Sequence, residues 1–283
     1  MRIPHWAVYT VLLTIIAVTL FSQQGAEREK DRNSVAAYLE ETASDPAPSG
    51  NMLPDANPFD EEVLVQVGDA EDGIGTAFAI NKSGQWITAR HVIDGCQRVG
   101  LAVGDGRMVR VDEVRTSEKS DLALLITDRA PAALELDLDR VLRIGESGYH
   151  VGFPQGRSGE ARSELVTRSR LVTRGRYVME EPVLAWDEKQ RSAGIDGTLS
   201  GMSGGPVFDA DGTVIGVTIA ESPRRGRIYT AGPESISSFL EDLGVIAPGG
   251  EARPLAATSY TREADRLRDQ RAVVKVLCRV SNP

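Results

Sequence analysis

Three short phrases occur in a fixed order along the chain, and they restrict its fold and chemistry more than any other feature. TARHV contains His91, DLALL begins at Asp121, and GMSGGP contains Ser203. A histidine, a carboxylate and a glycine-flanked serine are the three groups of a serine acyl-transfer site. Unrelated folds that share this chemistry place the groups in different orders, so the order and its local context help to select a fold.

Ser203 lies among glycines that have a physical use. A carbonyl attacked by a serine becomes an oxyanion, and backbone N–H groups must point at it. A loop that aims the N–H groups of Gly201 and Ser203 into one oxyanion hole needs backbone freedom and little bulk, which glycine supplies. The phrase therefore favours a nucleophile beside an oxyanion hole, and a plain glycine-rich turn is the alternative interpretation.

His91 is the candidate general base, because it follows a strand-like run and begins a short turn. A base must reach the serine oxygen and be oriented through its other ring nitrogen. The chain has three histidines. His5 lies in an apolar N-terminal segment, and His150 lies in GYHVG, where it is more typical of a structural strand side chain.

Asp121 is the candidate group that orients the histidine. It opens the apolar run DLALLI, and a carboxylate at the start of such a strand can be buried enough to hold one imidazole tautomer. Asp94 is an alternative, but it shares the short turn of His91, and a remote strand can brace the ring more rigidly. An ordinary turn aspartate is the third interpretation.

The order histidine, aspartate, serine excludes two other architectures. GMSGG also matches the nucleophile elbow of α/β-hydrolases, but there the histidine follows the serine, and no histidine occurs after His150. The subtilisin order needs a carboxylate before the histidine, and Asp69 and Asp72 lack the context of a strand start. The order is that of the chymotrypsin architecture.

Residues 59–245 have a sequence pattern typical of an all-β domain. Short apolar or alternating runs are separated by Gly, Asp and Ser turns at near-regular spacing, which favours a sandwich or barrel. The runs form two groups, with His91 and Asp121 in the first and Ser203 in the second. A helix is predicted over residues 234–243, where apolar residues recur at helical spacing.

The ends of the chain differ from this domain. Residues 1–22 contain an uncharged apolar run after Arg2, which indicates either an uncleaved membrane anchor or a cleaved signal peptide. Residues 23–58 are predicted to be a flexible linker, because much of the segment is rich in Pro, Ser, Asn, Asp and Gly. Positive charge before the run places the remainder outside the cytoplasm. Residues 246–283 are expected to be a C-terminal extension, to which no function is assigned.

Charge, cysteine content and the lack of metal-binding motifs limit the ligands that the chain is expected to bind. The formal net charge of −9 and pI near 5.0 disfavour a nucleic-acid-binding protein. Cys96 and Cys278 are the two cysteines, and either one disulfide or two free thiols is consistent with their spacing. The sequence contains no CxxC, no clustered His/Cys ligands and no HExxH, so neither a metal site nor a cofactor is predicted.

Over residues 60–245 the chain resembles trypsin-like serine peptidases of the bacterial high-temperature-requirement (Deg) type. TARHV, DLALL and GMSGGPVF carry the resemblance, supported by GTAF, YHVGFPQG and GTVIGV. It implies an all-β, chymotrypsin-like fold of two six-stranded β-barrels with the site in the cleft between them. It also implies that His91 is the base, Asp121 the orienting group and Ser203 the nucleophile, with the amides of Gly201 and Ser203 as oxyanion hole.

The chain departs from the family pattern at informative positions. Met202 stands where trypsin has the aspartate that receives a new N-terminal amine, so activation by N-terminal cleavage is not expected. The tail is too short for the PDZ domain usual in Deg-type enzymes, and no oligomeric state is carried over. Gly197, next to Thr198, stands where the Arg/Lys-cutting branch has a carboxylate, which suggests a preference for small or medium apolar residues.

The expected activity is that of a serine endopeptidase acting on a protein or peptide substrate. Its catalytic domain would be membrane-anchored and extracytoplasmic, of the periplasmic type, or alternatively secreted. We expect substrate backbone to pair as an added strand along Thr218, Ile219, Ala220 and Glu221. A non-catalytic peptide-binding member of the same fold is the alternative, but such a protein would tolerate loss of a triad residue. Esterase-type acyl transfer on the same scaffold also remains open.

Overall fold

The computed structural model describes residues 48, 50–104 and 106–280. The predicted apolar segment 1–22 and the predicted linker up to residue 47 lie outside the described residues. Within the described part, no helix combines the length and the apolar character that crossing a bilayer requires.

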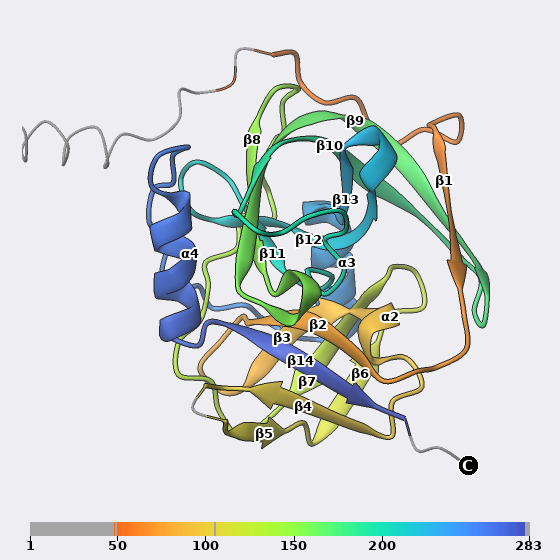
Figure 1. Cartoon of the computed structure of the whole chain (residues 1–283). Helices are drawn as coiled ribbons and strands as arrows, with labels where there is room; N and C mark the ends of the chain where they lie inside the picture. Colours follow the sequence, from red (N-terminus) through yellow and green to blue (C-terminus); the bar gives the residue numbers. More distant parts are fainter. Residues whose placement is uncertain (1–47, 49, 105, 281–283) are drawn as a thin grey trace, which may run out of the picture. The chain divides into compact units, whose positions relative to one another are not determined.

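Strands dominate the fold and form two seven-stranded sheets (Figure 1). The first sheet has the order β5-β4-β14-β2-β3-β7-β6. β2, β3 and β7 bury nearly all of their side chains, as their apolar sequences require. In chain order the strands are β2 (Gly73–Ala79), β3 (Gln85–Ala89), β4 (Arg98–Ala102), β5 (Met108–Arg110), β6 (Glu113–Thr116), β7 (Leu122–Ile126) and β14 (Val273–Arg279).

The second sheet has the order β1-β9-β10-β13-β12-β11-β8. A further pairing of β8 with β9 closes all of these strands except β1 into a ring. β1 lies outside the ring and pairs in parallel with β9. The strands are β1 (Glu62–Val67), β8 (Ser147–Gly152), β9 (Gly159–Gly175), β10 (Met179–Arg191), β11 (Pro206–Phe208), β12 (Val214–Ser222) and β13 (Arg227–Ala231).

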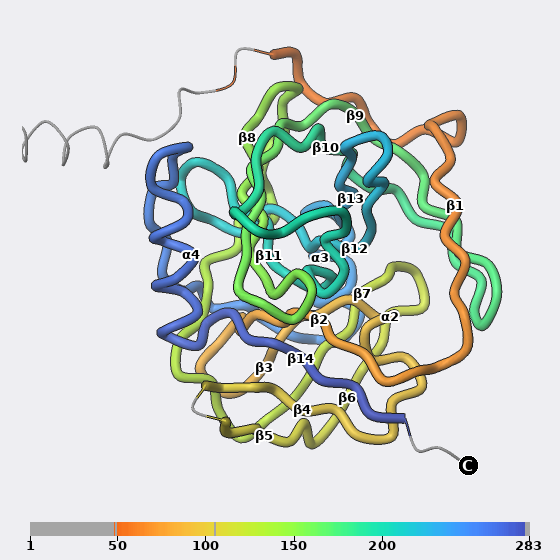
Figure 2. The backbone as a smooth tube through the Cα atoms, in the orientation of Figure 1, coloured from red at the N-terminus to blue at the C-terminus, as the bar shows by residue number. Residues whose placement is uncertain are grey.

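The implied six-stranded barrel occurs in the second half as the closed ring, to which β1 is added, whereas the first half has seven strands rather than six. β14 comes from the segment predicted as a C-terminal extension, yet it lies between β4 and β2, antiparallel to both. Figure 2 shows this last strand crossing the first sheet. It fits there because Val274 and Val276 are buried in the sheet. β1 adds the seventh strand to the other half, since it pairs with β9 rather than with β2.

A disulfide joins Cys278 on β14 to Cys96, three residues after a short helix, α2 (Arg90–Ile93). The two Cα atoms are 5.4 Å apart. Of the two states that the sequence left open, the structure has the paired one. The bond ties the last strand of the chain to the turn that follows His91.

Two longer helices flank the sheets. α3 (Pro233–Asp242) confirms the helix predicted over residues 234–243, with proline in its first turn and Ile236, Phe239 and Leu240 buried. α4 (Tyr260–Asp269) precedes β14, and its Tyr260 ring lies 5.4 Å from the ring of Tyr149 on β8. Both helices bury apolar residues in one core cluster that also includes side chains of both sheets. The two halves therefore share a core.

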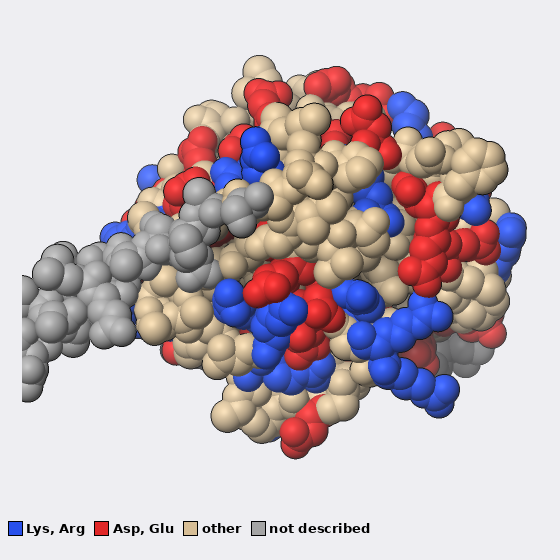
Figure 3. Space-filling model, turned by 90° about the horizontal axis from the view of Figure 1, so that it is seen from above, with Lys and Arg blue, Asp and Glu red and all other residues tan. Residues whose placement is uncertain are grey.

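The surface carries charges of both signs. Arg170 pairs with Glu62 at 3.0 Å and with Glu180 at 2.7 Å, and Arg168 pairs with Glu234 at 2.7 Å. In the face shown in Figure 3, acidic and basic side chains lie interspersed.

Candidate active site

The backbone brings His91 beside Asp121. β3 pairs antiparallel with β7 so that Ala89 faces Leu122, which places the residues just after β3 next to the residue just before β7. The Arg90 N–H donates to the Asp121 carbonyl at 3.0 Å. The His91 N–H donates to Asp121 Oδ1 at 2.9 Å, and His91 Nδ1 lies 2.5 Å from Asp121 Oδ2.

In this pair the carboxylate is buried and the imidazole is partly exposed, as expected for a base oriented by a carboxylate. Asp121 is 3% exposed, whereas the His91 side chain keeps 32% of its surface accessible. Burial alone would lower the pKa of His91, but the charge and the hydrogen bond of Asp121 outweigh it and raise that pKa above its ordinary value. The ring can therefore take up a proton and share the resulting charge with Asp121.

Two residues of the turn and strand that follow β9 contact Asp121, and sequence reasoning missed both. The Tyr177 hydroxyl donates to Asp121 Oδ1 at 3.2 Å, and the Asp121 N–H donates to Glu181 Oε1 at 2.7 Å. The Arg90 guanidinium lies 4.3 Å from the centroid of the Tyr177 ring. Both residues belong to the β9–β10 hairpin region, far along the chain from the triad phrases, and no motif marks them.

Glu181 is 1% exposed, and burial, together with the nearby charge of Asp121, raises its pKa to about 8. Its Oε2 atom is buried and makes no hydrogen bond within the described structure. A carboxyl group in this environment is mostly protonated at neutral pH. Glu181 therefore receives the Asp121 amide without adding a full negative charge beside Asp121.

Ser203 lies in a tight turn that both halves of the molecule hold. The Met202 N–H donates to the Leu199 carbonyl at 2.9 Å, and the Gly204 N–H donates to the Thr218 carbonyl at 2.7 Å. From the first sheet, the Thr76 N–H donates to the Ser203 carbonyl at 2.8 Å. Strand β2 thus fixes the position of the serine relative to the half that carries His91.

Gly201 shows why this turn needs glycine. Its φ is +96°, and a Cβ at this position would lie 2.6 Å from the Phe153 carbonyl oxygen. The Thr76 hydroxyl donates to the Gly201 carbonyl at 2.8 Å. The peptide after Gly201 is therefore fixed by the same β2 residue that holds Ser203.

One cleft of 440 Å³ brings the candidates together. His91, Asp121, Ser203 and Gly201 all line it. Ser203, Gly201 and His91, with the buried Asp121 carboxylate beside its ring, therefore line a single cleft.

The predicted substrate-binding residues separate into two groups. Ile219, Ala220 and Glu221 line the cleft. Thr218 is buried below it, where its N–H donates to the Gly205 carbonyl at 2.9 Å. Gly197 and Thr198 are exposed outside the residues that line the cleft, but the Thr198 hydroxyl bonds to the Glu221 carboxylate.

The rival residues have other partners. The Asp94 carboxylate binds Arg176, whose Nε donates to it at 2.9 Å. His150 is fully buried, with Nε2 2.7 Å from the Ser163 hydroxyl and Nδ1 3.2 Å from the Thr218 hydroxyl. Burial lowers the pKa of His150 to about 3. An enclosed imidazole of this kind supports packing and has no access to substrate.

A metal site is likewise not evident in the described ranges, where no group of three or more His, Cys, Asp or Glu residues is placed to hold an ion.

The chain is similar to known serine peptidases. Residues 75–217 match the family described as trypsin-like peptidase domain. The periplasmic pH-dependent serine endoprotease DegQ of Escherichia coli is 28% identical over 228 residues, which cover 78% of this chain and 44% of DegQ. The putative serine protease HhoA of Synechocystis is 31% identical over 152 residues, which cover 52% of this chain and 37% of HhoA.

Among solved structures, an inactive mutant form of Rv3671c from Mycobacterium tuberculosis superposes with a TM-score of 0.50 at 21% identity. The match covers 62% of this chain and 84% of that one. It supports a shared fold. The chain spans less than half the length of the curated relatives named here.

Proposed function

The chain belongs to the trypsin-like peptidase domain family, and from that premise we propose that it is a serine endopeptidase. The observation that carries the proposal is the buried Asp121 carboxylate 2.5 Å from His91 Nδ1, with Ser203 lining the same cleft. In this proposal Asp121 orients the ring, His91 is the general base and Ser203 is the nucleophile. The catalytic unit consists of residues 59–245, completed by β14 from the tail.

The reaction follows from the placement of these groups. The Ser203 oxygen attacks the scissile carbonyl carbon while His91 Nε2 takes the hydroxyl proton. The amides of Gly201 and Ser203 stabilise the negative oxygen of the tetrahedral intermediate. His91 then passes its proton to the leaving amine, which leaves an acyl-enzyme ester on Ser203. Water, deprotonated by His91, attacks the ester and releases the second product with the Ser203 hydroxyl restored.

Substrates in this proposal are proteins or peptides bound as an added strand. β12 carries Ile219, Ala220 and Glu221 along the cleft beside Ser203, and an extended peptide can hydrogen-bond to such a strand through its backbone.

The proposed location is extracytoplasmic. The Cys96–Cys278 disulfide is typical of oxidising compartments, and similar proteins are named periplasmic endoproteases. We further propose that the apolar N-terminal segment anchors the catalytic domain to the membrane, with secretion as the alternative.

Active-site labelling tests the activity. The full-length chain is treated with a fluorophosphonate, beside Ser203→Ala and the matched control Ser158→Ala, which alters an exposed serine before β9. We expect wild type and the control to be labelled and to cleave an unfolded protein substrate, and Ser203→Ala to do neither. Equal labelling and cleavage by wild type and Ser203→Ala would refute the assignment. Peptide binding without labelling in any of the three would support the non-catalytic alternative.

A further inference from the structure

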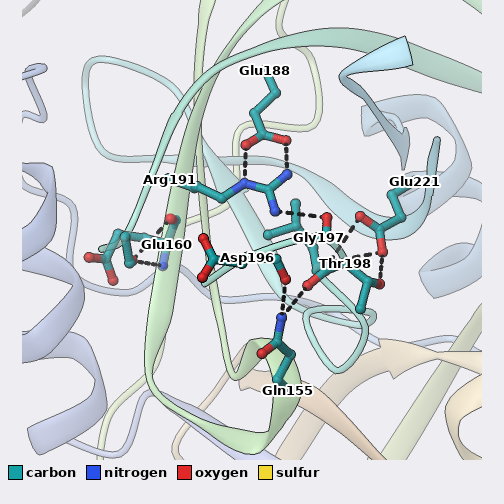
Figure 4. Close-up of polar contacts among 10 residues, drawn as sticks. Gln155, Glu160, Glu188, Arg191, Asp196, Gly197, Thr198 and Glu221 are labelled. Carbon is teal, nitrogen blue, oxygen red and sulfur yellow. Dashed lines mark hydrogen bonds and ion pairs between the residues drawn. The ribbon is translucent and has the colours of Figure 1, made fainter. Parts of the chain in front are cut away.

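The segment that leads to the nucleophile is held from outside by side chains. We call residues 194–200 the oxyanion loop. Its backbone atoms are bound by Gln155, Arg157, Arg191 and Glu221, several of which converge on the loop in Figure 4.

Gln155 makes the largest number of these contacts. Its side-chain Nε2 donates to the Asp196 carbonyl at 2.7 Å and to the Thr198 carbonyl at 2.9 Å. Its backbone N–H donates to the Ser200 carbonyl at 2.5 Å. One residue therefore binds three carbonyl groups of the oxyanion loop, the last of them directly before Gly201.

The backbone of Gln155 is in an unfavourable conformation. Gln155 lies in the 3-10 helix η1 (Pro154–Gly156), and its φ is +54°. This is the left-handed region of backbone conformation, which residues other than glycine seldom adopt. Such a conformation is energetically unfavourable and persists where the surroundings over-determine it. The three hydrogen bonds to the oxyanion loop are the surroundings that hold it.

These contacts decide where the Gly201 amide points. A trans peptide is planar, with its C=O and N–H directed to opposite sides. The Ser200 carbonyl is held toward Gln155, so the Gly201 N–H is directed away from Gln155. Rotation of this peptide by half a turn would replace the donor with a carbonyl oxygen, and glycine at position 201 makes such a rotation sterically accessible.

Residue 202 has no charge that could hold the turn in place of the Gln155 hydrogen bonds. Met202 is fully buried and offers no ion pair to fix the turn. On the other side of the loop, Glu221 accepts the Leu199 N–H with both oxygens, at 2.8 and 2.9 Å. Glu221 also lines the cleft on β12, so the loop is connected to the strand proposed to bind substrate.

We propose that Gln155 is a positioning residue that sets the donor geometry of the oxyanion hole by clamping the oxyanion loop through its side-chain amide and backbone N–H. This inference rests on the proposed peptidase function. Gln155 acts through Gly201, and its contribution is made in the transition state, where the substrate oxygen becomes an anion.

Three substitutions separate the parts of the clamp. Q155A removes both side-chain bonds and keeps the strained φ. Q155G removes the same bonds but relieves the strain. Q155E keeps nearly the same side-chain size but replaces the amide donor by a carboxylate, which repels the carbonyl oxygens of Asp196 and Thr198. Q190A is the matched control, because Gln190 is an exposed glutamine on β10 outside the loop.

We expect kcat for a peptide substrate to fall about tenfold or more in Q155A and Q155G, and further in Q155E, with KM within about threefold of wild type. Complete loss of one oxyanion donor typically lowers kcat about a hundredfold or more. A donor that is only misdirected should lower kcat by less, which gives the tenfold expectation. Affinity for a peptide aldehyde, whose adduct oxygen occupies the hole, should fall in parallel. The acid limb of the pH profile should stay in place, because the His91–Asp121 pair is untouched.

The inference is overturned if Q155A and Q155G keep kcat within twofold of wild type, or if the whole loss appears in KM. It is also overturned if Q155G restores wild-type kcat, since strain alone would then be responsible. Q155A and Q155G decide the matter if Q155E does not fold, as thermal unfolding will show. Failure of the peptidase assignment itself is distinct, because it would leave Ser203→Ala as active as wild type.

Discussion

The buried carboxyl group of Glu181 makes protein stability depend on pH in a direction opposite to that of most acidic residues. Glu181→Gln keeps an oxygen that can accept the Asp121 N–H and removes the titration. Because Glu181 has a pKa of about 8 in the folded protein against an ordinary value of 4.5, the native state holds a proton that the unfolded chain has already lost. The stabilisation is full below pH 4.5 and is lost as the pH rises through 8.

The magnitude follows from the size of the shift. Each pKa unit corresponds to about 1.4 kcal/mol, so the free energy of unfolding changes by up to about 5 kcal/mol between the two limits. The free energy of unfolding of wild type should therefore fall by about 3.5 kcal/mol relative to that of Glu181→Gln from pH 5 to pH 8. All other titrating groups occur in both proteins and cancel in the difference.

Urea denaturation at pH 5, 6, 7, 8 and 9 measures this difference. Glu180→Gln on the same strand is the matched control, because its carboxylate is exposed and pairs with Arg170, so its difference from wild type should vary far less with pH. A wild-type free energy of unfolding that stays constant relative to Glu181→Gln over this range, or that rises with pH relative to it, would show that the folded protein does not hold the extra proton.

Three further predictions concern the surroundings of the site. Reduction of the Cys96–Cys278 disulfide, which closes a loop of 182 residues, should lower the free energy of unfolding by about 5 kcal/mol on the chain-entropy relation. Urea midpoints with and without reductant measure this change, and the midpoint of the double serine variant should not depend on the reductant. Tyr177→Phe removes a hydrogen bond to Asp121 worth about 1 kcal/mol, so kcat/KM should fall about fivefold, and an unchanged value would deny Tyr177 a role. His150, with its pKa near 3 against an ordinary 6.5, should cost up to about 5 kcal/mol of stability as the pH falls from 6.5 toward 3, because the unfolded chain protonates first; His150→Gln should remove that dependence.

The local contexts in the sequence carried most of what could be predicted about the fold. Alternating and apolar runs predicted a mostly β protein, and the structure confirms this. The apolar run after Asp121 predicted a buried strand, which is β7. The family resemblance is confirmed by the match over residues 75–217. The roles of His91, Asp121 and Ser203 remain predictions, which the labelling experiment addresses.

The neighbours of those residues lay beyond sequence reasoning. Tyr177 and Glu181 come from a hairpin of the second sheet and meet Asp121 only after the two halves pack together. Gln155 stands in an ordinary Pro-Gln-Gly turn, and its left-handed backbone is visible only in the folded chain. Contacts of this kind leave no periodic pattern, because each depends on the relative placement of distant segments.

What the sequence alone determined is therefore the order of the three short phrases and the identity of the buried faces, since side-chain periodicity follows directly from strand geometry. Only the tertiary structure decided which strands are neighbours. β14 lies beside β2, and β1 pairs with β9. The physical reason is that strands join through backbone N–H and C=O groups that are alike in every residue except proline, so the partner is selected by side-chain packing and, here, by the Cys96–Cys278 bond.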